Sequence, residues 1–166
     1  MYIRSAVAED LPILETLYVR ARSYMREQGN HSQWGESYPL AAQMEDVAED
    51  ISLGRSYVCV DGAEIVGAFM LTAGPDPTYA HIEDGRWPDD GPYGVVHRVT
   101  TGGARRGAGE FCLRWCMERY ENLRIDTHTD NRPMLALLDK LGFVRCGVIY
   151  VEDGTPRTAF CIKRKE

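Results

Sequence analysis

Apolar residues recur every three or four positions in four stretches of the chain, and this spacing predicts four helices. The predicted helices run from Leu11 to a stop at Gly29, from 40 to 53, from Gly103 to about Tyr120, and from Asn131 to Gly142. Runs rich in β-branched and aromatic residues predict seven strands, at 2–5, 56–60, 64–72, 93–101, 123–127, 143–151 and 155–162. This order predicts one α/β (α+β) domain over residues 1–166. Its mixed, mostly antiparallel sheet of about seven strands has one parallel crossover and about four flanking helices.

The composition is typical of a globular chain, with 44% hydrophobic and 27% charged residues among 166. No apolar run approaches the roughly 20 residues of a membrane-spanning helix, and the first residues lack a signal-peptide pattern. We therefore expect a cytoplasmic protein that does not bind membranes. The formal charge of −6 argues against a nucleic-acid partner. Five scattered cysteines form no zinc motif, and we expect buried thiols.

The formal charge is unevenly divided along the chain. Residues 1–92 hold 16 acidic and 6 basic side chains, whereas residues 93–166 hold 9 acidic and 13 basic ones. Such a division favours two ligands of opposite charge, or it reflects uneven decoration of the surface.

A glycine-rich segment joins the end of a predicted strand, at Thr101, to the start of the third predicted helix. Glycines let the backbone approach a ligand closely, and free N–H groups at a helix N-terminus bind anions. Arg105 and Arg106 add positive charge, so the segment predicts a phosphate or pyrophosphate site. Neither common phosphate motif is complete, because Ala108 replaces the Walker lysine and Cys112 the third glycine of the dinucleotide motif. The alternative is a turn that only packs a helix on the sheet.

Two motifs, which follow each other along the chain, resemble those of the GNAT family, the Gcn5-related N-acetyltransferases. Gly107-x-Gly109 resembles the end of the family's acetyl-CoA loop, and residues 131–143 are similar to its N-x-x-A-x-x-L-Y-E-K-x-G-F motif. The opening residues 3–14 look like the family's first strand and helix, and the element order matches over nearly the whole chain. The resemblance implies a GNAT-like fold and an acetyl-CoA-dependent N-acetyltransferase.

The resemblance also assigns expected contacts with acetyl-CoA. Backbone N–H groups of Arg105, Arg106, Gly107, Ala108 and Gly109 would face the pyrophosphate. Val99, Thr100 and Thr101 would pair with the pantetheine arm, which Asn131 would also contact. Two positions depart from the family pattern: Ala104 replaces a Gln/Arg anchor, and Leu138 replaces a tyrosine that is the general acid in some members. The catalytic acid is therefore unassigned, and a non-catalytic acyl-CoA-binding protein stays open.

Acetyl transfer to an amine needs a base, because an ammonium group has no lone pair. His97 shares a strand face with Tyr93, which the resemblance places near the acceptor, and histidine is the usual side chain for this task. The alternative is a packed strand histidine. Glu83, beside Asp84 in the long loop, is a second candidate base or an attractor of a cationic acceptor; its alternative is a solvated loop. Asp126, His128 and Asp130 alternate as metal ligands can, but a strand end and helix cap explain them, and we expect no metal.

Aromatic residues in two loops predict the acceptor pocket. Gln33, Trp34 and Tyr38 lie between the first two predicted helices, where the resemblance places one wall, although Trp34 can instead fasten the loop to the core. Tyr79, with Trp87, would form the opposite wall. We therefore predict direct acetyl transfer to a small-molecule amine, without a covalent enzyme intermediate. A protein or peptide N-acetyltransferase is the alternative, and the sequence is compatible with a homodimer.

Overall fold

The computed structural model describes residues 1–103 and 105–165, so the predicted anchor position, Ala104, lies outside the described residues. The strands are β1 (Tyr2–Ser5), β2 (Ser56–Asp61), β3 (Glu64–Ala73), β4 (Gly94–Thr100), β5 (Asn122–Thr127), β6 (Val144–Tyr150) and β7 (Pro156–Lys163). The helices are α1 (Leu11–Glu27), α2 (Leu40–Ser52), α3 (Ala108–Met117) and α4 (Arg132–Leu141), with short 3-10 turns η1 (Ala8–Asp10) and η2 (Pro77–Tyr79).

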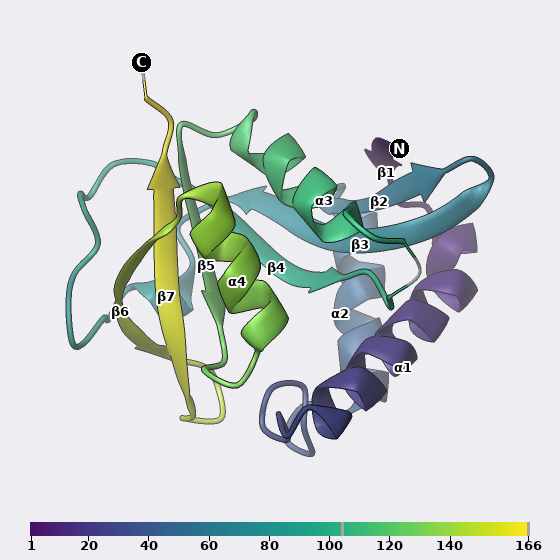
Figure 1. Ribbon diagram of the computed structural model, residues 1–166, viewed down its shortest axis with the longest axis horizontal. Coiled ribbons are helices and arrows are strands. Elements are labelled where there is room, and N and C mark those ends of the chain that lie inside the picture. Colours follow the sequence, from purple (N-terminus) through teal and green to yellow (C-terminus); the bar gives the residue numbers. More distant parts are fainter. Residues whose placement is uncertain (104, 166) are drawn as a thin grey trace.

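The strands form one sheet in the order β1-β2-β3-β4-β5-β7-β6 (Figure 1). All neighbours are antiparallel except β4 and β5, which are parallel and joined through α3. A parallel pair needs such a crossover because the chain must return to the same end of the sheet. The predicted fold class, mixed and mostly antiparallel with four helices, is confirmed.

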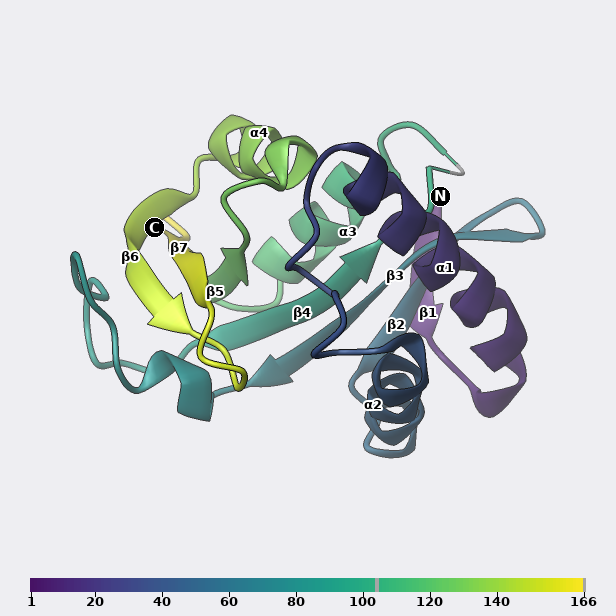
Figure 2. The same cartoon turned by 90° about the horizontal axis from the view of Figure 1, so that it is seen from below.

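Helices cover both faces of the sheet, and the alternation of apolar residues along the strands explains why. On β2, Val58 and Val60 pack with α1 and α2, whereas Cys59 faces the opposite side with α3 and α4. Successive side chains of a strand point to opposite faces, so an apolar strand such as this one must be covered twice. Figure 2 shows the two layers, with α3 and α4 on one side of the sheet and α2 on the other.

The third helix differs from its prediction, because it begins at Ala108 rather than just after Gly103. Gly102, Gly103 and Gly107 have φ values of 56°, 71° and 84°. This left-handed backbone suits glycine and interrupts a right-handed helix. The segment before α3 is therefore a loop, as a ligand-binding turn requires.

The long segment between β3 and β4 is held to the body of the protein at several points. Glu83 forms a single β-bridge with Val148 of β6. The Arg124 guanidinium lies over the rings of Trp87 and Tyr93, at 4.3 and 3.8 Å from their centroids. Such cation–π contacts fix the path of the loop. Its first residues stay close to β4 through the Gly74 N–H, which donates to the Tyr93 carbonyl at 2.9 Å, and through Asp76, which contacts His97.

Two further expectations concern the cysteines and the membrane. All five cysteines are free and buried, as predicted. Burial raises the pKa of the Cys112 and Cys116 thiols, which keeps them protonated and poor nucleophiles. Among the described residues, no helix is long and apolar enough to cross a bilayer.

Candidate active site

The site begins where the two parallel strands separate. β4 and β5 pair only at Gly94 with Leu123 and at Val95 with Arg124, although both strands continue for several residues. A register shift against β3 and a positive φ of 53° at Arg98 bend β4 at this point. The Tyr18 hydroxyl donates to the Arg98 carbonyl at 2.7 Å and holds the bend. Beyond Val95 the facing edges of β4 and β5 no longer bond to each other.

A cavity of about 410 Å³ opens at this separation. Its walls come from the α1–α2 loop, β4, β5, the start of α4 and the β6–β7 turn. Six residues predicted for the site line it: Gln33, Trp34, Tyr38, His97, Val99 and Asn131. One lining hydroxyl, Thr127 Oγ1, is buried and has no hydrogen-bond partner among the described residues. A buried polar atom without a partner is costly, so this hydroxyl points to a ligand.

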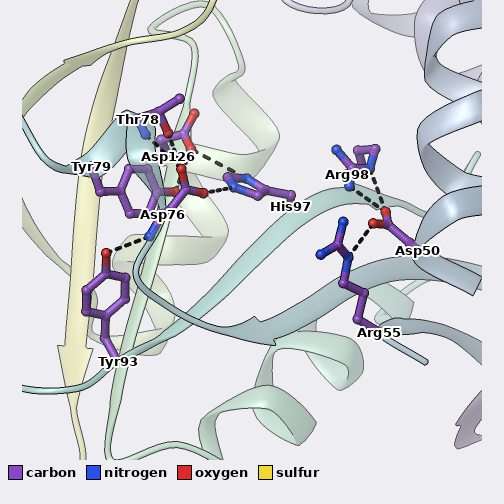
Figure 3. Close-up of polar contacts among 9 residues, drawn as sticks. All are labelled: Asp50, Arg55, Asp76, Thr78, Tyr79, Tyr93, His97, Arg98 and Asp126. Carbon is purple, nitrogen blue, oxygen red and sulfur yellow. Dashed lines mark hydrogen bonds and ion pairs between the residues drawn. The ribbon is translucent and has the colours of Figure 1, made fainter. Parts of the chain in front are cut away.

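His97 lies between two carboxylates on the cavity wall (Figure 3). Its Nε2 is 2.6 Å from Asp76 Oδ2, and its Nδ1 is 3.7 Å from Asp126 Oδ1. Burial pulls the pKa of Asp76 upward, but hydrogen bonds from His97 and Thr78 outweigh it and set this pKa at about 2. An ionised carboxylate only accepts, so the neutral imidazole carries its proton on Nε2. The Nδ1 lone pair then faces the side of Asp126.

Asp126 is held by a buried tyrosine. The Tyr79 hydroxyl donates to Asp126 Oδ1 at 2.6 Å, and the Tyr79 side chain is only 2% exposed. Burial and the neighbouring carboxylate raise the pKa of Tyr79 well above its usual value, so it stays a donor. The expectation that Tyr79 forms the acceptor wall is therefore corrected, because its ring lies beneath the wall and orients Asp126.

A second buried carboxylate supports the bend in β4. Asp50, on α2, is 2% exposed and accepts from Arg55 Nε at 2.7 Å and from the Arg98 guanidinium (Figure 3). Two cations around one buried anion compensate its desolvation. Burial lowers the pKa of Arg98, but the Asp50 carboxylate more than offsets this and leaves it raised. Arg98 is therefore fixed in place and its charge is neutralised.

The α1–α2 loop forms one wall of the cavity, and Trp34 both fastens this loop to the core and lines the cavity. Its ring packs edge-on against Tyr18, with centroids 5.6 Å apart, and it also lines the cavity. Gln33 Oε1 accepts from the Asn131 side chain at 3.1 Å, which joins this wall to the start of α4. Asn131 also caps α4 by accepting from the Met134 N–H at 3.3 Å. The side chain expected to contact the cofactor arm is thus held by the acceptor wall.

Three other predicted residues lie elsewhere. Glu83 is exposed outside the cavity, where it bonds to the Tyr150 hydroxyl at 2.9 Å and to His81 at 3.1 Å. Asp84, also exposed, pairs with Arg145 at 2.7 Å. The expectation that these two acids face the acceptor is corrected, because the β-bridge at Glu83 turns this part of the loop to β6. Tyr93 lies behind the site, where its hydroxyl accepts from the Asp76 N–H at 2.9 Å.

The acids that do line the cavity were missed in the sequence. They are Asp46, Asp76, Asp126, Glu152 and Asp153, against Arg98 and Arg157. Asp126 was assigned to a strand end, and Asp76 is 21 residues from His97 in a loop without periodicity. The cavity therefore carries an excess of negative charge, although from other acids than those predicted. That charge favours a ligand with a cationic group.

The Asp126, His128, Asp130 alternation serves local structure. His128 Nδ1 accepts from the Asp130 N–H at 3.0 Å, and its Nε2 is 2.9 Å from Ser32 Oγ. Among the described residues, no group of three His, Cys, Asp or Glu side chains is arranged to hold a metal ion.

The expected cofactor loop lies at the start of α3. Among the described residues no side chain caps this helix at Gly107. The Ala108 N–H bonds to the Arg105 carbonyl at 3.3 Å, and the N–H groups that follow it in the first turn remain for an outside acceptor. A Cβ at Gly107 would meet nothing within 4 Å, so the approach is open. Arg105 pairs with Asp61 at 3.0 Å, while Arg106 is exposed. Thr100 is buried beside α1 and Thr101 sits at the loop entrance, so any contact of Thr100 with a ligand is through its backbone.

Leu138, where many GNAT members carry a tyrosine, is 0% exposed and belongs to the core between the sheet and α3. Tyr150, on β6, lies outside the cavity, where its hydroxyl donates to Glu83 Oε2 at 2.9 Å.

Neither a family model nor a curated protein matches the chain, but solved structures match it over almost its whole length. A GNAT family acetyltransferase from Streptococcus agalactiae 2603 has a TM-score of 0.89 and 24% identity, covering 99% of this chain and 96% of that one. One from Listeria monocytogenes 4b F2365 has a TM-score of 0.70 and 17% identity, covering 98% and 94%. A Salmonella typhimurium protein solved with its cofactor acetyl-CoA has a TM-score of 0.63 and 14% identity, covering 99% and 94%.

These likenesses establish that the chain has the GNAT fold, as the sequence motifs indicated. The same fold occurs in an agmatine N-acetyltransferase and in a ribosomal-protein-alanine N-acetyltransferase from Brucella melitensis, so acceptors differ widely within it. A fold does not choose a substrate. The acceptor has to be inferred from the side chains of this cavity.

Proposed function

We propose that the protein is an acetyl-CoA-dependent N-acetyltransferase that acts on a small amine by direct transfer. The observation that carries the proposal is the cavity at the separation of β4 and β5, with His97 on its wall and its Nε2 bonded to Asp76. This arrangement supports the proposal of a base with a free lone pair beside a slot for an extended ligand.

The chain's own groups fit acetyl-CoA. The unpaired edge of β4 beyond Val95 offers backbone partners to an extended amide-containing arm. On β5, Thr127 Oγ1 has no hydrogen-bond partner within the described part of the chain. The uncapped start of α3, with Arg106 exposed beside it, suits a pyrophosphate. When bound, the cosubstrate supplies an acetyl thioester, which is activated for attack by an amine.

His97 is proposed as the base. Asp76 holds the proton on Nε2, so Nδ1 can take a proton from the acceptor's ammonium group. Asp126, 3.7 Å from Nδ1, would hold that ammonium group next to the lone pair. The neutral amine then attacks the thioester carbonyl, the new C–N bond forms, and the C–S bond breaks. The attacking nitrogen loses its second proton, the departing thiolate gains one, and CoA leaves as the free thiol. Holding both reactants in one cavity supplies much of the rate.

The acceptor is proposed to be small and cationic. The volume of about 410 Å³ suits a small molecule, and five carboxylates against two arginines favour an ammonium group. Trp34 would cover the apolar part of the acceptor.

The test is release of free CoA thiol from acetyl-CoA across a panel of small amines, peptides and protein lysines, with calorimetry for CoA binding. Turnover of a small amine that falls about 100-fold or more in His97→Gln, with CoA affinity unchanged, would support the proposal. CoA binding without turnover of any acceptor would contradict it and favour a non-catalytic binding protein. Turnover of peptides alone would contradict the small-molecule assignment.

A further inference from the structure

The two arginines of the cavity differ in how their charges are used. Arg98 is neutralised by the buried Asp50. Arg157, the second residue of β7, forms no ion pair within the described part of the chain, although it is only 7% exposed. Its Nη1 donates to Thr155 Oγ1 at 3.0 Å and to the Pro156 carbonyl at 2.8 Å. One corner of the guanidinium is thus anchored to the β6–β7 turn.

The other donors of Arg157 are free. Nε and Nη2 have no hydrogen-bond partner among the described residues. Neither atom is fully buried, so both can be reached by a ligand. Arg157 lines the cavity, and Nε and Nη2 are the part of its guanidinium that the β6–β7 turn leaves unbonded. Burial lowers the pKa of Arg157, and Asp126 and Asp153 only partly oppose this. A buried cation without a contact partner is costly, so a ligand that supplies an anion relieves that cost.

The position of Arg157 relative to the proposed base follows from the strand register. On the antiparallel strands β5 and β7, Asp126 pairs with Ala159 and Thr127 pairs with Thr158. Arg157 is the residue of β7 just before Thr158 and so lies one position beyond the last of these pairs. Asp126 therefore lies between His97, on β4, and the Arg157 end of β7. An amine held at Asp126 would have Arg157 on its far side from His97.

We propose that the acceptor carries a carboxylate as well as its amine, and that Arg157 binds this carboxylate through Nε and Nη2. The acceptor class is then an amino acid or an amino-acid-like amine, an inference that rests on the proposed function. The planar fork of a guanidinium matches two carboxylate oxygens. The surrounding acids repel a ligand that has only negative charge, so the cavity selects one with both charges.

The experiment uses matched ligands. Proteinogenic amino acids, each paired with its decarboxylated amine, are titrated by calorimetry into the CoA-bound protein. We expect at least one amino acid to bind about 10- to 100-fold more tightly than its amine. Arg157→Gln abolishes this preference while CoA affinity is kept, and Arg157→Lys keeps part of it. Arg20→Gln, the same charge change on an exposed residue of α1, is the control and leaves the preference unchanged.

The inference is overturned if no amino acid binds more tightly than its amine, including if no member of the panel binds. A preference that persists in Arg157→Gln overturns it as well. The preference of the wild-type protein for an amino acid over its amine is measured without any variant. The inference can therefore be refuted even if a variant misfolds. Thiol release measured on the same ligands keeps the two proposals apart. An amino acid that binds through Arg157 and is never acetylated would defeat the proposed function and leave the carboxylate site standing.

Discussion

Replacing Asp76 with asparagine tests how His97 is prepared for catalysis. Thr78 donates to Asp76 Oδ1 from both its N–H, at 2.9 Å, and its hydroxyl, at 2.7 Å. These two donors keep an oxygen at that position in Asp76→Asn, so the new amide nitrogen faces His97 Nε2. An amide nitrogen only donates, which forces Nε2 to accept and moves the ring proton to Nδ1. The lone pair needed for the amine is then lost.

The loss in activity follows from this change of tautomer. We expect kcat/KM of Asp76→Asn to fall about 100-fold or more, the usual contribution of a general base, with CoA affinity unchanged. Nitrogen-15 NMR of the imidazole at neutral pH reports the tautomer directly, with protonated Nε2 in the wild type and protonated Nδ1 in the variant. A variant that keeps the wild-type tautomer and rate would refute this reasoning.

The same substitution has a calculable effect on stability. The pKa of Asp76 falls from 3.8 to about 2 on folding, which corresponds to about 2 kcal/mol of stabilisation by the charged form. Because the folded-state pKa is the lower one, this stabilisation is present above pH 3.8 and is lost as the pH falls toward 2. About half of it is lost by pH 3.

Urea unfolding at pH 7, 4 and 3 measures this directly. We expect Asp76→Asn to be about 2 kcal/mol less stable than the wild type at pH 7, with a difference that shrinks as the pH falls. Asp90→Asn, an exposed acid of the same loop, should stay within about 0.5 kcal/mol of the wild type. A difference that grows on acidification would contradict the account in which hydrogen bonds from His97 and Thr78 stabilise the Asp76 carboxylate.

Three further substitutions test other parts of the site. If the start of α3 holds the pyrophosphate, Arg106→Gln should weaken CoA binding severalfold in calorimetry and leave the acceptor KM unchanged in steady-state kinetics. An unchanged CoA affinity would contradict this. Asp126→Asn should raise the acceptor KM about tenfold and Glu83→Gln should leave it unchanged, because Asp126 lines the cavity and Glu83 does not. Equal effects of the two substitutions on KM would contradict the placement of the acceptor in this cavity. Leu138→Tyr should destabilise the fold by about 1–3 kcal/mol in urea and give no gain in rate, since position 138 is in the core; a faster enzyme would contradict this.

The regular spacing of apolar residues made most of the helices and strands predictable from the sequence. The strands and helices follow apolar spacing, and the sheet order follows from the short turns and one crossover. The start of α3 was predicted too early, because composition alone does not tell which of several glycines have positive φ. Local backbone conformation, not the apolar pattern, decides that boundary.

The candidate site was predictable where it lies on regular elements. Strand alternation places His97 on the same face as Tyr93, and the family resemblance assigns Asn131, which opens a predicted helix. Asp76 was not predicted, because its approach to His97 depends on the path of a loop that has no periodicity; its one signal is an Asp-Pro-Thr turn. For the same reason, the sequence does not separate Asp76 from Glu83, the candidate base in the same loop. Arg157 was missed because a polar residue on a strand is ordinarily taken as solvent-exposed.

The central claim is that the acetyl group passes directly from the thioester to the amine, with His97 taking the proton. A quenched reaction with labelled acetyl-CoA and a reactive amine, analysed by mass spectrometry of both the small molecules and the intact protein, tests it most directly. The account predicts that the label appears on the amine as thiol is released, that the protein mass stays unchanged, and that His97→Gln slows both events together. A labelled protein that forms before the product, or a His97→Gln variant with wild-type rate, would contradict it.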